Sequence, residues 1–242
     1  MPSQPETNPI PDIDLSKLRI WLSGAVPESD TVPLGTKQSF EVWGGSSLEH
    51  GILGFVQEFS SLVFKFGGQI IHGCHPTLTP ILIEQAKRFG SDGETKKLNL
   101  AVSDFFEKQS SGDWARWRKA ANVEVVPRTG DGDENRDPSL AVLREKMVEQ
   151  CNAFVVIGGL WWKDRPGRAG IPKEFELAKS NSRPCFVLGG FGGALASYIE
   201  DSPDWEKDLN NGLRKDENSR LARETEFSLA AGRLVAHLSC LV

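Results

Sequence analysis

Six apolar runs alternate with amphipathic stretches along this 242-residue chain, and this alternation constrains the fold more than any other feature. The run at 152–159 is continuous rather than alternating, which is typical of a parallel strand buried on both faces. Helical spacing of apolar residues follows each run, so we predict an α/β fold with a doubly wound, mostly parallel sheet and flanking helices. The six expected strands lie at 18–26, 69–74, 97–106, 123–128, 152–159 and 183–190.

The length fits one domain of the α/β size class. Residues 1–17 carry four prolines near their start and are predicted to form a disordered or extended lead, and residues 18–242 a single domain. The stretches 91–96 and 129–137 are polar and are predicted to be loops.

After Pro203 we expect helices only, over 204–213 and 220–241. The second of these has an apolar stripe of Leu221, Phe227, Leu229, Leu234, Val235 and Leu238. A helix of this length takes its stability from packing such a stripe. Because helices elsewhere in the chain are expected to cover the sheet, we predict that this stripe packs in a homodimer interface.

Composition excludes several classes of protein. The net charge is −5, which disfavours binding to a nucleic-acid backbone because that requires a concentrated basic face. No apolar run is long enough to span a bilayer, and the first residues lack the pattern of a signal peptide, so a cytoplasmic location is expected. The four cysteines are widely spaced and fit a reducing compartment. His72, Cys74 and His75 have no second ligand group at metal-site spacing, so no metal is expected.

Glycine-bearing turns follow four of the expected strands, and their positions indicate a ligand site. In a parallel sheet these turns lie at one edge, where glycine lets the backbone approach a phosphate and the following helices present positive N-termini. Strand-to-helix turns also favour glycine for structural reasons alone, but four on one edge favour a nucleotide crevice. The candidate residues in these turns are Ser23, Gly24, Ala25, Gly73, Gly158, Gly159, Gly190, Phe191, Gly192 and Gly193.

The common nucleotide and hydrolase motifs are absent from the sequence. No G-x-G-x-x-G follows the first strand, and there is no G-x-x-x-x-G-K-[ST], G-x-S-x-G or H-E-x-x-H. The crevice is therefore not an ordinary dinucleotide site, P-loop or nucleophile elbow.

Three segments together resemble the SLOG superfamily, the Rossmann-like group that includes the LOG phosphoribohydrolases and the Smf/DprA proteins. They are IWLSGAVP (20–27), GGQIIHGCHPTLTPIL (67–82), and NAFVVIGG (152–159) followed by residues 170–194. The GGFGG-type turn is most similar to the branch associated with TIR and Sir2 domains in bacterial immunity. The resemblance implies a nucleotide ligand, such as an ADP-ribose derivative, and no resident cofactor.

The resemblance also implies a pair of site residues. Gly170-Ile171-Pro172-Lys173-Glu174 keeps the spacing of the LOG G-T-x-x-E motif, with Ile171 in place of threonine. Arg144 is the nearest match to the family's arginine on the preceding helix. If the chain is an enzyme, Glu174 and Arg144 are its catalytic candidates; Glu174 otherwise caps its helix or contacts a ribose, and Arg144 is a surface residue.

Further polar and aromatic residues are candidates beside the crevice. Arg165 and Arg168 suit a phosphate, or are solvated loop charges. His75 and Thr77 at a helix start suit a phosphate, or form a structural turn. Trp161-Trp162 either stack on a base or pack as a lid.

These observations lead to two functional hypotheses of different classes. The first is a sensor module that binds an ADP-ribose or NAD-derived nucleotide in antiphage defence, as a homodimer or larger assembly with a separate effector chain. The second is an enzyme that cleaves an N-glycosidic bond, such as a LOG-like phosphoribohydrolase. A DprA-like single-strand DNA binder is disfavoured by the net charge.

Overall fold

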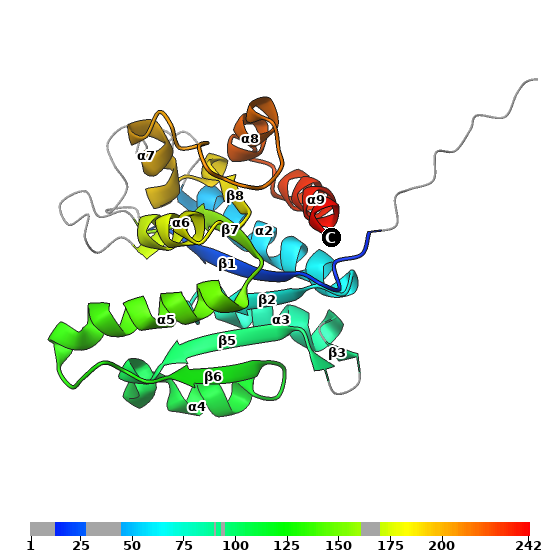
Figure 1. The fold of residues 1–242 in the computed structure, drawn as a ribbon. Helices are drawn as coiled ribbons and strands as arrows, with labels where there is room; N and C mark the ends of the chain where they lie inside the picture. The colour runs from blue at the N-terminus through cyan, green and yellow to red at the C-terminus, as the bar shows by residue number, and fades with distance from the viewer. Residues whose placement is uncertain (1–12, 28–44, 90, 93–94, 161–169) are drawn as a thin grey trace, which may run out of the picture.

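The computed structural model describes residues 13–27, 45–89, 91–92, 95–160 and 170–242. Its centre is a six-stranded sheet in the order β6-β5-β2-β1-β7-β8, and every neighbouring pair is parallel (Figure 1). The strands are β1 (Arg19–Ala25), β2 (Gln69–His72), β5 (Leu98–Ser103), β6 (Asn122–Val126), β7 (Ala153–Gly158) and β8 (Cys185–Leu188). The predicted doubly wound, Rossmann-like α/β fold is confirmed.

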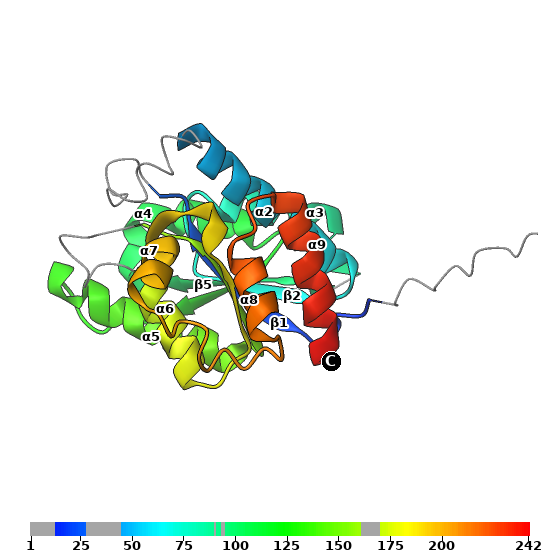
Figure 2. The same ribbon diagram turned by 90° about the horizontal axis from the view of Figure 1, so that it is seen from above.

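Helices cover both faces of this sheet (Figure 2). One face packs against α2 (Gly45–Lys65), α3 (Thr79–Phe89), α4 (Glu107–Trp117) and α9 (Phe227–Leu238). The other packs against α5 (Arg136–Gln150), α6 (Gly170–Ser180) and α7 (Gly193–Asp201). A further helix, α8 (Lys215–Ala222), lies beside β8 at the edge. Because both faces are covered, β7 and β8 are apolar and buried at every position, as their sequence pattern indicates.

The chain reverses its direction of winding between β1 and β7. From β1 it passes outward through β2, β5 and β6, and it then returns to place β7 on the other side of β1. Ser23 pairs with Val156 and Ala25 with Gly158 across this junction. In open α/β sheets the strand order leaves a crevice at such a switch point, outside the carboxyl ends of the strands.

Two stretches differ from the sequence-based expectations. Residues 91–96 contain a short antiparallel pair, β3 (Ser91–Asp92) and β4 (Thr95–Lys96), instead of a plain loop. Residues 204–213, predicted to be helical, form turns, and Asp208 and Asn210 there have positive φ angles. This stretch follows the edge of β8, where Leu209 accepts a backbone hydrogen bond from Cys185, so edge pairing takes the place of helix.

The C-terminal stretch also differs from the prediction, and this difference removes the argument for a dimer. It forms two helices, α8 and α9, because the Glu226 side chain accepts hydrogen bonds from Ser228 N and Leu229 N and begins a new helix. Leu234 and Leu238 are fully buried in the core formed with α2 of the same chain. The prediction that this stripe forms a homodimer interface is therefore wrong.

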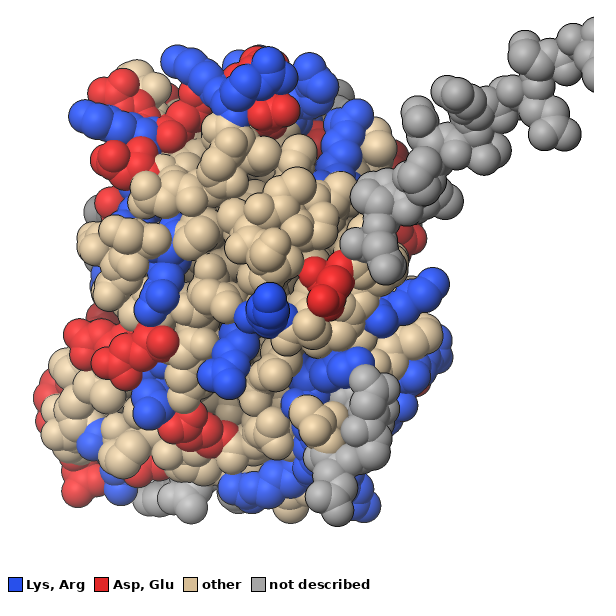
Figure 3. All heavy atoms as spheres, turned by 45° about the vertical axis from the view of Figure 1, so that its right-hand side comes forward, with Lys and Arg blue, Asp and Glu red and all other residues tan. Residues whose placement is uncertain are grey.

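The N-terminal lead is described only from residue 13 onward. Leu15, which falls within the predicted lead, is fully buried, and its backbone N–H donates to Phe66 O at 2.8 Å. Among the described helices none has the length and apolar character needed to cross a membrane. On the face of the described chain shown in Figure 3, basic and acidic side chains are interspersed and form no continuous basic strip.

Candidate functional site

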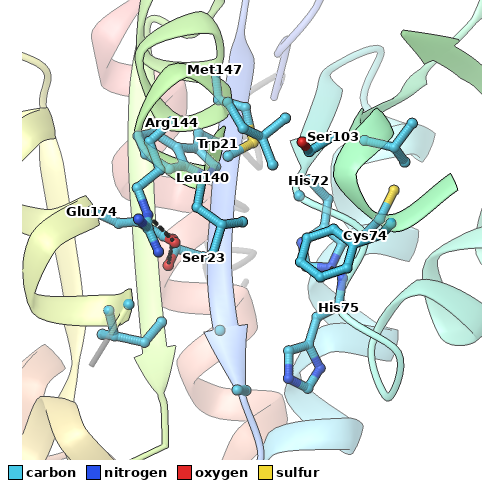
Figure 4. A pocket seen from close by; sticks show the side chains of 18 of the residues that line it. Trp21, Ser23, His72, Cys74, His75, Ser103, Leu140, Arg144, Met147 and Glu174 are labelled. Atoms are coloured by element: carbon cyan, nitrogen blue, oxygen red, sulfur yellow. Dashed lines mark hydrogen bonds and ion pairs between the residues drawn. The ribbon is translucent and has the colours of Figure 1, made fainter. Parts of the chain in front are cut away.

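A crevice of about 610 Å³ opens at the carboxyl ends of β1, β2 and β5, on the β1 side of the switch point. Helices α5 and α6 supply its other wall (Figure 4). Its volume lies within the range of about 300–1,000 Å³ that is typical of small-molecule sites. Ser23, Gly24, Ala25, Gly73, His75 and Glu174 from the sequence-based candidates line it, as does Arg144.

Three of these side chains form a connected polar cluster on one wall. Glu174 of α6 accepts a hydrogen bond from Arg144 Nε of α5 at 3.0 Å through Oε1. Through Oε2 it accepts the Ser23 hydroxyl of β1 at 2.6 Å (Figure 4). The Arg144 and Glu174 side chains are only 13% and 18% exposed, so solvent screens their ion pair weakly. The structure thus brings the two catalytic candidates into direct contact.

The local sequence explains why the cluster can form. Gly170 begins α6 next to the guanidinium, and a Cβ at this position would lie 3.1 Å from Arg144 Nη2. A side chain here would crowd the guanidinium, so the glycine leaves room for it. Glu174 lies one helical turn after Gly170, which places its carboxylate beside the same guanidinium.

Two histidines stand on the opposite wall. His72 is buried, donates through Nδ1 to Leu22 O at 2.9 Å, and accepts the His75 backbone N–H through Nε2 at 3.2 Å. Burial lowers the pKa of His72 to about 4, so the ring is neutral near pH 7. Burial also lowers the pKa of His75, whose Nδ1 accepts the Thr77 N–H at 3.3 Å. This pattern of hydrogen bonds leaves the proton of neutral His75 on Nε2, as a donor at the crevice.

The remainder of the lining is mostly apolar, and sequence reasoning did not single it out. One group comes from β5 and the segment that follows it, and a second group comes from α5. The residues are Val102, Phe106, Trp114 and Trp117 in the first group and Leu140, Leu143 and Met147 in the second. The sequence could have indicated that Trp114 and Trp117 face the same side, because they lie three residues apart on a helix.

The turn at Gly189–Gly193 does not line this crevice. A Cβ at Gly190 would lie 2.2 Å from Glu224 O, and one at Gly193 would lie 2.6 Å from Gly159 O. Phe191 is buried, with its ring centroid 6.0 Å from that of Phe55. These residues, Gly192 among them, pack against the chain itself.

The remaining candidates fall into three groups. Gly158 is the last residue of β7, and the N–H of the following Gly159 donates to Ala25 O of β1 at 2.7 Å; neither glycine lines the crevice. Thr77 is exposed and contacts the His75 ring. Arg165, Arg168 and Trp161-Trp162 lie outside the described residues. Within the described ranges, no group of three His, Cys, Asp or Glu side chains is arranged to hold a metal ion.

The fold and this site define a Rossmann-like α/β protein with a ligand crevice beside its topological switch point. Residues 125–204, from the end of β6 to just beyond α7, match the family model described as SLOG cluster2. This segment, about a third of the chain, is similar to the SLOG superfamily. A search of the curated proteins gives no match.

The matched segment contains both Arg144 and Glu174. The similarity of this segment to the family suggests a module that binds or processes a nucleotide. The association with the TIR and Sir2 branch stays a prediction.

Proposed function

We propose that this chain is a nucleotide-binding sensor module that recognises an ADP-ribose or NAD-derived nucleotide in the crevice beside the switch point. The observation that carries the proposal is the Ser23–Glu174–Arg144 cluster on the crevice wall. A carboxylate held from two sides keeps further lone pairs that accept the hydroxyl groups of a ribose.

The charges around the cluster support a ligand that carries phosphate. Arg144 pairs with Glu174 and offsets its negative charge, which reduces repulsion of a phosphate nearby. His75 on the facing wall contributes a donor at Nε2. We assign the ribose to the Glu174 wall and the phosphate to the side of the crevice near His75.

One observation favours the second candidate, an enzyme that cleaves an N-glycosidic bond. Glu174 and Arg144 are the two residues that the LOG resemblance requires, and they lie 3.0 Å apart in a crevice. In the present structure each oxygen of the Glu174 carboxylate already accepts a hydrogen bond, an arrangement suited to holding a ribose. We therefore place the sensor first and the hydrolase second.

The experiment that separates the two classes combines binding and turnover. The protein is incubated with AMP, NAD and cyclic ADP-ribose, with calorimetry for binding and chromatography for released base. A sensor binds at least one of these nucleotides without releasing base. Base release that disappears in Glu174→Gln would instead establish the enzyme.

For the sensor, Glu174→Gln is expected to weaken nucleotide binding by about tenfold to a hundredfold, because hydrogen bonds to a charged group contribute about 1.5–3 kcal/mol. Glu176→Gln is the matched control, since it changes the same residue type on the same helix outside the crevice. Equal affinities for the two variants would contradict the placement of the ribose at Glu174.

The wider biological role is proposed on the family resemblance alone. It comprises antiphage defence, a homodimer or larger assembly, and an effector on a separate chain. An assembly of this kind would use a surface other than the apolar stripe of α9, which packs on α2. Light scattering with and without AMP or ADP-ribose measures whether the assembly exists and whether ligand changes it.

A further inference from the structure

A second polar group faces the crevice, on the wall opposite Glu174. Ser103 is the last residue of β5, and its hydroxyl points toward the cavity (Figure 4). The residue is only 1% exposed. Its Oγ accepts the Phe105 backbone N–H at 3.3 Å, but the described residues provide no hydrogen-bond acceptor for its hydroxyl hydrogen. Buried donors are almost always paired, so this hydroxyl indicates a bound group that carries an acceptor atom.

The surroundings of Ser103 are suited to a flat apolar ring. Val102, Phe106, Trp114 and Trp117 of the β5–α4 segment, which begins at the strand that carries Ser103, line the crevice, and Leu140, Leu143 and Met147 of α5 line it as well. Aromatic side chains stack on nucleobases, and this stacking does not depend on particular hydrogen bonds. A base bound at this end would therefore make mostly apolar contacts, and a single hydroxyl, that of Ser103, would supply a hydrogen bond.

We propose that this end of the crevice is the base subsite and that it takes an adenine ring, to which Ser103 donates a hydrogen bond at a ring nitrogen. This inference rests on the proposed function and names its ligand class. Adenine offers unprotonated ring nitrogens as acceptors. Guanine would bury an additional carbonyl and ring N–H among apolar side chains, and a pyrimidine would leave part of the aromatic surface uncovered.

The two polar groups then contact different parts of the ligand. Ser103 and Glu174 face the crevice from opposite walls, with the Met147, Leu140 and Trp21 side chains between them (Figure 4). A nucleoside spans such a site with its base at Ser103 and its ribose at Glu174. In this arrangement Ser103 determines the specificity of the crevice for the base.

The test uses the full chain and calorimetry with AMP, ADP-ribose, GMP, and the 1-deaza, 3-deaza and 7-deaza analogues of AMP. Each analogue replaces one ring nitrogen with a C–H group. We expect one analogue to bind the unaltered protein about tenfold more weakly than AMP, which corresponds to about 1.4 kcal/mol. In Ser103→Ala, AMP and that analogue should bind equally.

Ser60→Ala is the matched control, because it removes another buried hydroxyl, on α2, outside the crevice. It should leave the order of the analogues unchanged. If Ser103→Ala does not fold, the analogue series on the unaltered protein still overturns the proposal when all three analogues bind like AMP.

Four results would overturn the proposal, and they show whether the proposed function fails with it. If all three analogues bind like AMP, or if one is weaker by the same factor in Ser103→Ala, then Ser103 does not contact the base, whereas the proposed function stands. If a guanine nucleotide binds as tightly as AMP, the subsite does not select adenine. If neither AMP nor ADP-ribose binds, the proposed function fails together with this inference.

Discussion

At the scale of single residues, the crevice depends on side chains whose partners come from distant parts of the chain. Glu174 meets Ser23 across 151 positions and Arg144 across 30 positions. His72 is fixed by the Leu22 carbonyl and by the backbone of His75. Each polar group here has an orientation set by a partner from a different element or turn, which is the arrangement that a preformed binding site requires.

The buried His72 predicts a specific pH dependence of stability. Its pKa is lowered by burial to about 4 in the folded chain, while an unfolded chain takes up the proton near pH 6.5. Between these values the unfolded state binds more protons, so the free energy of unfolding falls as the pH decreases from about 6.5 to about 4. The contribution is on the order of 3 kcal/mol and levels off below that range.

Urea unfolding at pH 7.5 and pH 5 of the unaltered chain and of His72→Asn measures this effect. The variant should lose less stability on acidification, because asparagine keeps a donor for Leu22 O and cannot be protonated. An identical loss in both proteins would assign the acid sensitivity to other groups, among them His75 and His237, whose pKa values burial also lowers.

At the scale of elements, α9 shows how an apolar stripe finds its partner. Its inward residues pack against α2 and form part of the larger apolar core. The outward face carries Leu229, which is 43% exposed. The apolar stripe is therefore buried within a single chain, where it completes the cover of the sheet on the α2 side.

Two leucines on this helix give a matched prediction. Leu234→Ala should reduce the free energy of unfolding by about 2–5 kcal/mol, since it leaves a cavity in a fully buried position. Leu229→Ala should change it by no more than about 0.5 kcal/mol. Chemical denaturation compares the two, and similar losses would mean that the packing of α9 on α2 contributes little to stability.

At the scale of the whole molecule, the winding of the sheet places the crevice where several elements meet. The ends of β1, β2 and β5 form it together with α5 and α6. A ligand bound there contacts elements from both halves of the chain. Binding to the folded state alone stabilises the entire domain by mass action.

A thermal unfolding series tests this coupling. At a concentration one hundred times its dissociation constant, a bound nucleotide stabilises the fold by about 2.7 kcal/mol, and for a chain of this size Tm rises by about 2–4 °C per kcal/mol. AMP, ADP-ribose and NAD are the probes, and inorganic phosphate at equal concentration is the control. If phosphate alone gives the same rise, the crevice recognises an anion and not a nucleotide.

The sequence by itself determined the layers of this protein and several residues of its site, among them Glu174 and Arg144. Strand and helix periods are local properties of the chain, so the six central strands, the parallel sheet and most of the flanking helices could be predicted. The family resemblance identified Glu174 by its spacing from Gly170 and Arg144 by its place on the preceding helix, and the structure brings these two residues together.

Only the tertiary structure decided which turns and side chains reach the crevice. The glycines at 189–193 were predicted to hold phosphate, but Gly190 packs against Glu224 and Gly193 against Gly159. Nothing in their local pattern distinguishes a turn that meets a ligand from one that meets its own chain. The Ser103 hydroxyl and the tryptophans of α4 join the site because β5 lies two strands from β1. The sequence also left undetermined which surface the apolar stripe of α9 packs against, because an apolar face favours burial but does not specify the surface that buries it.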